Sequence, residues 1–511
     1  MKKYTYSKIT VLIFGFLSLF GCTDMLDQEP LGLATPQNFW VSQANVESAL
    51  AGDYALLKEA LTKDSNFMLW GEFTGMTFMD SQFWIVDYIE GSGNYVLAYR
   101  DDSRNWKGFY RAANWALSIE KHVSEMPDSD FQSKAEKNRL IGEAAFVRSL
   151  SYFYLARIWG DAPIVDEVIE TSDQLIKDGY IITKPRENEL KVLDFALAAA
   201  NKAISLLDYS TPGAPKWAIT ANKASAEALK AHITLWYASR DQGNPAMLAQ
   251  ALAAANSVIG NSNASLIDYA NEGVDGFNDM CIGQSKTGLF EINISSAMNE
   301  SYRVDGGDNT MTGLTLTDPF FLNPNSTAPI ISDDFYGKDM MNSDSDRDND
   351  KRKELFFSDF DSNEQSSLMK YSQATRDGQS SDPYARFSES NILIFRLADI
   401  YLLRAEANMK LGNTTAAVSD LNTIRSKANV PNYTGATDSQ SLTKAIFDER
   451  AIELVGEGQS GFDRIRMNYY AGVSWMSPSR LSHQGCFWPV DPTIISINPA
   501  IVQTDYWKGK L

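Results

Sequence analysis

The sequence predicts a mainly α-helical fold in which tetratricopeptide-like helical hairpins stack into a single domain that carries long irregular loop insertions. Apolar residues recur at spacings of three and four over long stretches, which is the period of an amphipathic helix. Short turns rich in Gly, Asn and Pro join these stretches in pairs. Two other segments largely lose this period, and they predict the insertions.

The helical pattern is clearest in the middle and near the end of the chain. Gly160-Asp161-Ala162-Pro163 ends the first of these helices, because proline cannot continue a helix. Gln242-Gly243-Asn244 and Gly412-Asn413 are the turns that join two later pairs. The helices predicted in this way span 138–159, 187–207, 222–240, 245–259, 395–411 and 414–429.

The hairpin from Arg396 to Ala428 is the most regular, and it resembles a tetratricopeptide repeat of about 34 residues. The pair 222–259 is a looser copy, and 138–207 contains a third copy with an insertion. One such hairpin cannot bury its apolar face alone, so the copies should stack on one another. Small side chains stand where the two helices of the regular hairpin would cross, at Ala405, Ala407, Ala416 and Ala417.

Two irregular segments interrupt this pattern, at about 68–104 and 266–391, and we call them the first and second excursions. The second is rich in Gly, Asn, Ser and Asp. A loop-rich stretch of this length is unusual in a compact domain unless it has a function. We therefore predict one domain, residues 39–511, and expect the excursions to have a function.

The N-terminus has the composition of a secretory signal. Lys2, Lys3 and Lys8 precede an apolar stretch, Ile9–Phe20, that is too short to span a bilayer as a helix, which takes roughly 20 residues. The stretch ends at Leu19-Phe20-Gly21-Cys22, which resembles the lipobox of bacterial lipoproteins. That resemblance implies a signal peptide over 1–21, an acylated Cys22 and a flexible tether over 22–38. The alternative is an ordinary secretory signal with a chance cysteine.

The net charge argues against one class of partner, and the cysteine count bears on whether the domain contains a disulfide. The formal net charge of −19 repels phosphate backbones, so nucleic acid is not an expected partner. Cys281 and Cys486 remain once Cys22 is acylated. A disulfide between them stays open, although two separately buried thiols are the favoured interpretation because a domain of this size needs no such link.

Two motifs resemble known ligand-binding sequences but lack features that those sequences need. Gly456–Gly461 matches G-x-G-x-x-G, yet it follows a predicted helix, 445–455, rather than a strand, so we interpret it as a helix stop and turn. Asp344–Asp350 resembles a calcium loop, but Asn349 and Leu355 occupy the positions where an EF-hand needs Gly and Glu. We expect a solvated loop there, with adventitious calcium as the lesser alternative.

No other pattern indicates catalysis. The three histidines, His122, His232 and His483, lack metal-ligand spacing, and the nucleophile elbow G-x-S-x-G does not occur. A pair of glycosidase carboxylates stays open among the many acidic residues. We predict no catalytic residue, no metal and no cofactor.

Several blocks of the sequence resemble the SusD/RagB family, in the order in which that family has them. The blocks are Phe39–Tyr54, Trp106–Asn114, Gly142–Pro163, a helix expected over Leu393–Ala407, Glu449–Arg466 and Phe487–Tyr506. Two places depart from the family pattern, namely Gln459-Ser460 and Val490-Asp491. The resemblance covers nearly the whole chain, but its motifs belong to the scaffold and do not identify a ligand.

The resemblance implies a function. SusD-like proteins are outer-membrane lipoproteins that capture glycans and deliver them to a TonB-dependent, SusC-like transporter without breaking a bond. The acidic stretch after Cys22, Thr23–Pro30, is similar to the surface-export signals of these lipoproteins, which implies that the protein faces the cell exterior.

The family builds its ligand site from the two excursions. Sugar rings pack on aromatic faces, and their hydroxyl groups need polar partners beside those faces. The candidate ligand-binding residues are Asp80, Gln82, Trp84, Tyr88, Tyr302, Arg303 and Phe320. Further members of this set are Trp70, Phe78, Phe83, Tyr95, Asp305, Phe321 and Tyr336. For each aromatic residue, packing within the loop is the alternative.

Two other functions stay open on the sequence alone. One is a surface glycan-hydrolysing enzyme, and the other is a repeat scaffold that binds other proteins. Which glycan, or even peptide, is bound is not determined by the sequence.

Overall fold

The computed structural model describes most of the chain after residue 38. The described residues are 39–63, 66–75, 101–169, 176–177, 180–181, 183–294, 302–303, 341–342, 345–357, 360, 368–376, 386–388, 390–471, 473 and 475–510. The predicted signal peptide, Cys22 and the predicted tether lie outside them.

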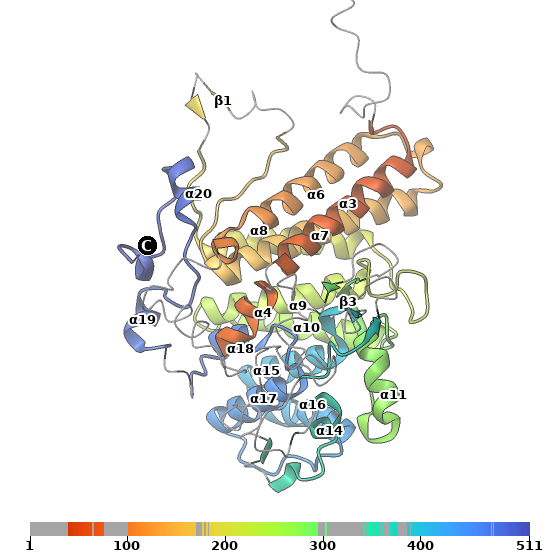
Figure 1. Cartoon of the computed structure of the whole chain (residues 1–511), viewed down its shortest axis with the longest axis vertical. Helices are drawn as coiled ribbons and strands as arrows, with labels where there is room; N and C mark the ends of the chain where they lie inside the picture. The colour runs from red at the N-terminus through yellow and green to blue at the C-terminus, as the bar shows by residue number, and fades with distance from the viewer. Residues whose placement is uncertain are drawn as a thin grey trace, which may run out of the picture.

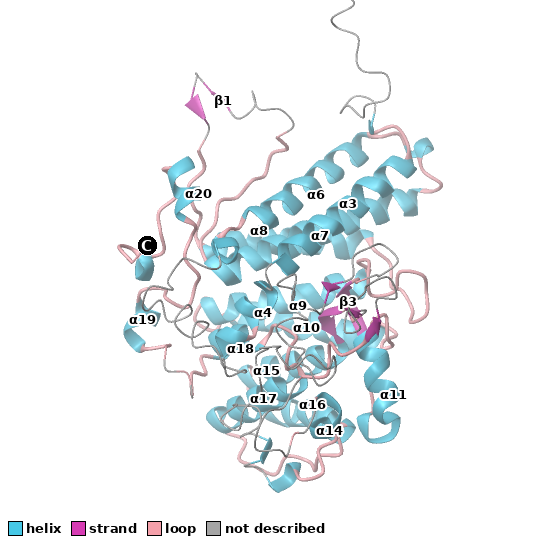
Figure 2. Ribbon diagram, in the orientation of Figure 1, coloured by secondary structure: helices cyan, strands magenta, loops and turns pink. Residues whose placement is uncertain are grey.

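Helices dominate the described residues (Figures 1 and 2). The longer ones are α3 (Gln43–Thr62), α6 (Lys107–Glu125), α7 (Lys134–Trp159), α8 (Glu189–Leu206), α9 (Lys223–Arg240), α10 (Pro245–Asn261), α11 (Tyr269–Ile282), α15 (Leu397–Lys410), α16 (Thr414–Lys427) and α17 (Ser439–Glu453). The short ones are α4 (Asn66–Gly71), α14 (Arg352–Phe356), α18 (Ser460–Met467), α19 (Pro478–Ser482) and α20 (Pro492–Ile497), with 3-10 turns η3 (Phe73–Gly75), η5 (Asp101–Arg104), η6 (Asp128–Asp130), η9 (Ser345–Arg347) and η10 (Asp505–Trp507).

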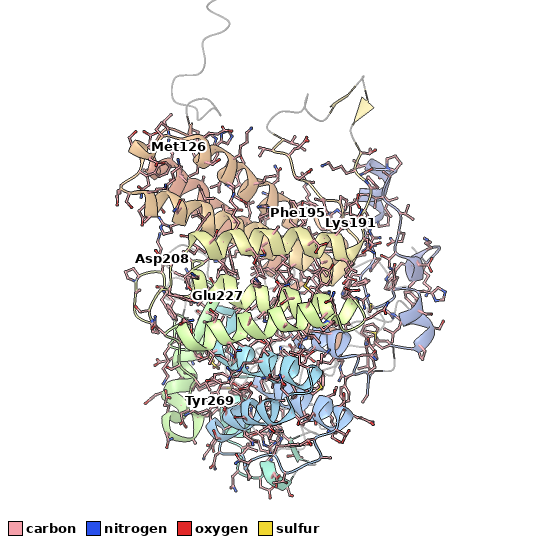
Figure 3. The ribbon with its side chains drawn as sticks, turned by 180° about the vertical axis from the view of Figure 1, so that it is seen from behind. Met126, Lys191, Phe195, Asp208, Glu227 and Tyr269 are labelled. Carbon is pink, nitrogen blue, oxygen red and sulfur yellow. The ribbon has the colours of Figure 1, made fainter. Side chains whose placement is uncertain are left out.

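The long helices form one continuous stack. Each helix packs mainly on its neighbour in the chain, in the order α3, α6, α7, α8, α9, α10, α15 and α16, with α17 also against α15. In Figure 1, α3, α6, α7 and α8 lie side by side at one end, and α15, α16 and α17 lie at the other. Seen from behind in Figure 3, the helices that carry Phe195 and Glu227, α8 and α9, run next to each other. Because α10 packs directly on α15, the second excursion is an insertion into the stack.

Local sequence signals explain where the helices begin and end. The Asn222 side chain accepts hydrogen bonds from the first turn of α9, and Ser225 bonds back to it in a capping box. Pro245 begins α10, where a missing N–H costs nothing. Gly160 ends α7 with a φ of +71°, a left-handed conformation that favours glycine.

The core runs the length of the stack, and α7 lies at its centre. Every residue of α7 from Leu140 to Trp159 is buried, and some of its polar side chains are paired with neighbouring elements. Arg148 donates two hydrogen bonds to the buried Glu120 of α6, at 2.6 and 3.0 Å. Trp159 donates from Nε1 to the carbonyl oxygen of Pro489 and so ties α7 to the C-terminal segment.

The predicted fold class and stacked hairpins are confirmed, with one correction in detail. The helix expected over 393–407 begins only at Leu397, because Ile392–Arg396 forms strand β7. Within the second excursion, α11 consists of two short helical pieces that meet at a kink at Gly273.

The strands are short, and they lie mostly in the second excursion. β3 (Gly288–Ile292) pairs antiparallel with β7 (Ile392–Arg396), and both strands are buried along their whole length. β4 (Tyr302–Arg303), β6 (Arg386–Ser388) and β5 (Ala374–Arg376) form a second antiparallel sheet in that order. β1 (Ile176–Lys177) and β2 (Tyr180–Ile181) form a hairpin between α7 and α8. Among the described residues, no helix has the length and apolarity needed to cross a membrane.

Candidate functional site

The predicted ligand-binding residues stand mostly outside the described part of the chain. Asp80, Gln82, Trp84, Tyr88 and Phe320 lie outside it, as do Phe78, Phe83, Tyr95, Asp305, Phe321 and Tyr336. The backbone of Tyr302 and Arg303 forms β4, which pairs with Ser388 and Phe387 of β6. What the structure describes in detail are the places where the excursions leave and rejoin the helical frame, and we call these places the roots.

The root of the first excursion lies between α4 and α18. The Gly75 carbonyl oxygen accepts a hydrogen bond from Nε of Arg464 at 2.8 Å, and a Cβ at Gly75 would lie 2.2 Å from Oγ of Ser460. The chain rejoins the frame at η5, where Trp70 donates from Nε1 to the carbonyl oxygen of Ser103 at 2.8 Å. Trp70 is buried in the core, so this member of the aromatic candidate set serves packing and does not face a ligand.

The root of the second excursion is fixed by a buried asparagine. Asn391 accepts from the backbone N–H of Ile294 and donates to the carboxylate of Glu291, both at 2.9 Å. Lys58 of α3 donates to the carbonyl oxygen of Asn293 at 2.6 Å. Residues next to β7 and on α3 therefore hold the chain at the point where 295–340 begins.

Glu291 is an unusual acid at this root. Burial raises the pKa of Glu291 to about 7, although the hydrogen bonds from Asn391 and from the Gln284 N–H oppose that rise. Its Oε1 has no hydrogen-bond partner among the described residues. The group therefore costs free energy when it is ionised, and that cost depends on pH.

A tyrosine links the neighbouring elements. Tyr54 of α3 donates to Glu143 of α7 at 2.8 Å, and its oxygen accepts from the Ala221 N–H at the same distance. A groove of about 280 Å³ runs beside it, between α3, α7 and the end of β3. Its lining includes Leu50, Phe290, Lys58, Arg139 and Glu291.

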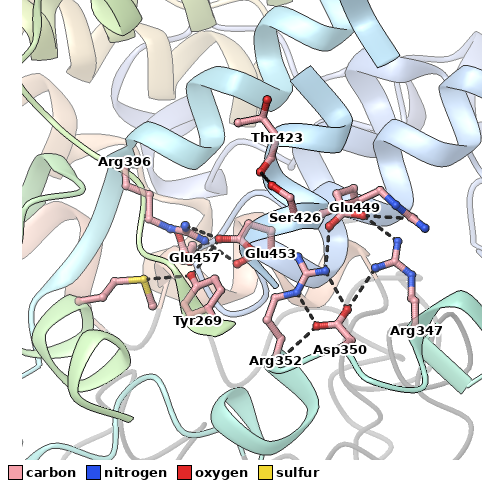
Figure 4. Close-up of polar contacts among 12 residues, drawn as sticks. Tyr269, Arg347, Asp350, Arg352, Arg396, Thr423, Ser426, Glu449, Glu453 and Glu457 are labelled. Atoms are coloured by element: carbon pink, nitrogen blue, oxygen red, sulfur yellow. Dashed lines mark hydrogen bonds and ion pairs between the residues drawn. The ribbon is translucent and has the colours of Figure 1, made fainter. Parts of the chain in front are cut away.

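A buried cluster of charged residues joins the second excursion to α17 (Figure 4). Arg396, at the end of β7, donates to Glu453 and Glu457 at 2.7 and 2.8 Å. Arg352 of α14 bonds to Asp350 and pairs with Glu449 and Glu453 at 2.8 and 2.9 Å. All of these side chains are buried.

The expectation of a solvated loop over 344–350 is confirmed for Ser345, Asp346, Asp348 and Asn349, which are exposed, but not for two residues of this cluster. Arg347 and Asp350 are both buried, and they bond to each other as well as to α17 and α14. These two charged residues, and not the whole segment, are therefore internal ion-pair partners. By contrast, the interpretation of Gly456–Gly461 as a turn is confirmed, because α17 ends at Glu453, Gly456 and Gly458 have positive φ, and α18 starts at Ser460.

The structure also shows a polar hollow that the sequence analysis missed. It has a volume of about 210 Å³ and lies where the end of α3 meets the start of α4 and of α6. Its residues come from three short stretches of chain: Glu59, Ala60 and Lys63; Asn66; and Asn105, Lys107, Gly108 and Arg111. Since these stretches share no motif, only the packing of the helices brings them together.

The two cysteines of the body are separate buried thiols, as predicted. Burial raises the pKa of Cys486 to about 11, so this thiol stays protonated at neutral pH. Among the described residues, no group of three or more His, Cys, Asp or Glu side chains is placed to hold a metal ion.

Comparisons with known proteins agree with this architecture. The family described as "SusD family" matches residues 358–490, and the family described as "Starch-binding associating with outer membrane" matches residues 26–235. The chain is 26% identical over 542 residues to SusD-like protein P38 of Formosa agariphila, and the match covers 98% of this chain and 99% of that protein. It is also 32% identical over 104 residues to the starch-binding protein SusD of Bacteroides thetaiotaomicron, which covers 20% of this chain and 18% of that one.

Solved structures give the same result. The crystal structure of a SusD homolog from Bacteroides thetaiotaomicron is similar with a TM-score of 0.77 and 23% identity, over 92% of this chain and 100% of the other. A SusD superfamily protein from the same organism has a TM-score of 0.69 at 26% identity, over 92% and 99% of the two chains. With both ends of the sequence matched by related families and the fold shared over nearly its full length, the chain belongs to the SusD/RagB family.

Proposed function

We propose that the protein is a cell-surface lipoprotein that binds an oligosaccharide or polysaccharide and passes it to a TonB-dependent, SusC-like outer-membrane transporter. The observation that carries this proposal is membership of the SusD/RagB family along nearly the whole chain. One matching family is described by starch binding and by association with the outer membrane, and one similar protein is named as starch-binding.

In this proposal the helical frame fixes the ends of the excursions, and the excursions supply the main contacts to the glycan. The ligand contacts come from Asp80, Gln82, Trp84, Tyr88, Tyr302, Arg303 and Phe320. The described roots support such a division of labour, because Arg464 and Asn391 hold the exit points by buried hydrogen bonds. Fixed ends limit the conformations that a binding loop must give up when it closes on a sugar.

The sequence start supports attachment to the outer membrane. Residues 1–21 act as a signal peptide, Cys22 carries the lipid, and 22–38 form the tether in this proposal. Replacing Cys22 with serine should abolish incorporation of radiolabelled palmitate and release the protein from the membrane fraction. Protease treatment of intact cells should digest the wild-type protein if it faces the exterior, and resistance would contradict that orientation.

Binding without bond cleavage distinguishes this function from that of a surface hydrolase. We expect isothermal titration calorimetry of the detergent-solubilised full chain against a glycan panel to detect at least one ligand. The same mixtures should release no new reducing ends over hours. Release of reducing ends would favour the hydrolase, and absence of binding to every glycan would overturn the proposal and favour a protein-binding scaffold.

The handover step needs its own test. Chemical cross-linking in intact outer membranes, followed by purification through a tag on this chain, should yield a TonB-dependent barrel identified by mass spectrometry. A strain lacking that barrel should still bind the glycan at its surface but should not import it. Import at the normal rate in that strain would contradict the role of the barrel as the partner.

A further inference from the structure

The C-terminal segment of the chain exposes apolar side chains to solvent. Ile497, the last residue of α20, is 73% exposed, and Val502, a few residues later, is 60% exposed. These are the two highest values for a large apolar side chain in the described part of the chain. Pro492 and Pro499 are exposed as well, and α20 has no buried residue. We call residues 492–502 the C-terminal ridge.

The C-terminal ridge is uncharged, although the protein is strongly acidic. The chain has a formal net charge of −19, and 22% of its residues are Asp, Glu, Lys or Arg. Between Arg480 and Asp505 there is only one such residue, Asp491, and it is buried and caps α20. Single exposed apolar side chains are common on protein surfaces, but several of them together on an uncharged segment indicate a surface that binds a partner.

Hydrogen bonds hold the backbone of the ridge in place. Arg186 donates to the carbonyl oxygens of Val502 and Trp159, at 2.9 and 2.6 Å, and so ties the ridge to the end of α7. The Gln503 side chain accepts from the Val490 N–H and donates to the Val490 carbonyl oxygen, at 2.9 and 2.7 Å. The ridge is therefore an ordered part of the fold, and an ordered surface loses little conformational entropy when a partner binds.

The side chains of the ridge favour a protein partner over a lipid surface. Segments that lie in a membrane interface combine apolar residues with Trp, Tyr, Lys or Arg, and residues 492–502 contain none of these four. The polar residues of the ridge are Thr493, Ser496 and Asn498, which suit the polar rim of a protein interface. A second copy of this chain is a poor partner, because two bodies with a net charge of −19 repel each other.

The small size of the ridge indicates where its partner lies. α20 has only six residues, and the whole ridge is far smaller than the roughly 20–30 residues that each side of a stable interface contributes. Such a surface needs a second attachment that keeps the partner close. The proposed lipid on Cys22 supplies one, because it confines the protein to the outer membrane and so raises the effective concentration of a partner embedded there.

We propose that the C-terminal ridge is a docking surface for the TonB-dependent transporter, and that it packs against an uncharged, aliphatic patch on the exposed side of that barrel. The ridge rests on the proposed function, which supplies the membrane partner, and it adds a surface through which the two proteins meet. Ile497 and Val502 make the apolar contacts, and the hydroxyl groups of Thr493 and Ser496 lie at the edge.

Photo-cross-linking in intact outer membranes tests the contact. The photoreactive amino acid p-benzoylphenylalanine is placed at Ile497, at Val502 or, as a control, at Val274. Val274 of α11 is 59% exposed, which matches Val502, and α11 and α20 lie on opposite sides of the stack in Figure 1. We expect positions 497 and 502 to cross-link to a TonB-dependent barrel, identified by mass spectrometry, and position 274 not to do so.

Charge substitutions test whether the contact contributes to binding. Ile497→Glu and Val502→Glu would each bury an unpaired carboxylate in the interface, so binding of the detergent-solubilised full chain to the purified barrel should weaken roughly tenfold or more. Val274→Glu should leave this affinity unchanged. All three variants should keep the wild-type melting temperature and glycan affinity, because the substituted side chains are exposed.

Each outcome decides a different question. Equal cross-linking and equal affinity for the ridge and control positions would overturn the docking surface and leave the proposed function intact. If the wild-type protein binds no barrel, the handover step of the proposed function fails, and the ridge fails with it.

Two controls test the other occupants of the ridge. The Cys22→Ser chain, which would carry no lipid, should not float with vesicles of outer-membrane lipid, and light scattering should show it as a monomer. Flotation or a dimer that Val502→Glu abolishes would assign the ridge to a lipid surface or to a second copy of the chain, and would overturn the proposal.

Discussion

Replacing Arg396 with methionine tests whether the buried ion-pair cluster holds the second excursion to the helical frame. Arg396 is the last residue of β7, and its guanidinium group bonds to Glu453 and Glu457. It is 1% exposed. Methionine keeps most of the apolar stem but leaves two buried carboxylates short of a cation, with Arg352 still near Glu453 and Lys370 still near Glu457.

We expect a loss of about 3–5 kcal/mol in the free energy of unfolding, which is typical when one partner of a buried ion pair is removed. The loss should also depend on pH. Burial would raise the pKa of Glu453, but Arg396, Arg352 and Lys370 prevail and lower it to about 2 from its ordinary 4.5. A depressed folded-state pKa stabilises the protein above pH 4.5, and this contribution disappears as pH falls toward 2. The difference in unfolding free energy between wild type and variant should therefore decrease as pH falls from 4.5 toward 2.

Urea unfolding, followed by tryptophan fluorescence and circular dichroism, measures both effects. Arg111→Met is the matched control, since its pair with Glu59 is about half exposed and should contribute about 0.5 kcal/mol or less. The reasoning fails if Arg396→Met costs no more than this control. It also fails if the difference from wild type is the same at pH 3 as at pH 7.

Three further predictions concern the roots and the ligand. Glu291→Gln should raise the free energy of unfolding at pH 8 by about 1–3 kcal/mol. The folded-state pKa of Glu291, about 7, lies above the ordinary 4.5, so the wild-type protein loses stability as pH rises between these two values. Thermal unfolding at pH 5 and pH 8 measures this effect, and a wild type more stable than the variant at pH 8 would contradict it. Gly71→Ala should lower the free energy of unfolding by about 1–3 kcal/mol, because the added Cβ would lie 2.0 Å from the Gly458 carbonyl oxygen. Gly52→Ala on α3 is the control: a Cβ there has open space, so this variant should be neutral or stabilising in the same thermal assay. Trp84→Ala should weaken glycan binding by calorimetry roughly tenfold, and unchanged affinity would rule out stacking of a sugar on that ring.

Most of the helical stack could be predicted because its signals are local. Gly160, Asn222 and Pro245 mark helix ends that the structure reproduces within a residue or two. Strand β7 was missed for a physical reason. Its sequence, Ile392–Arg396, is a short apolar run. Such a run is equally typical of a buried strand and of the start of the helix that follows. The strand forms because β3, about one hundred residues earlier, pairs with it.

The buried charges could not be predicted from the sequence around them. Residues 344–350 hold four aspartates and one arginine, a composition that is usual for an exposed loop. Arg347 is buried because Glu449 of α17 pairs with it, and Arg352 because Glu449 and Glu453 do. These partners lie about one hundred residues later in the chain. A local pattern shows the charges, but only the assembled stack provides the opposite charges that make their burial tolerable.

The roots explain how the helical stack can tolerate changes in the excursions. Gly75 is held by Arg464 and Ile294 by Asn391, so each excursion starts from a residue fixed by a contact that is distant in sequence. Once the ends of a loop are fixed, the entropic cost of closing it grows only slowly with loop length. Residues 76–100 and 295–340 can therefore change in length and composition with little effect on the stack. The fold accordingly stays similar over 92% of the chain to a solved SusD homolog at only 23% identity.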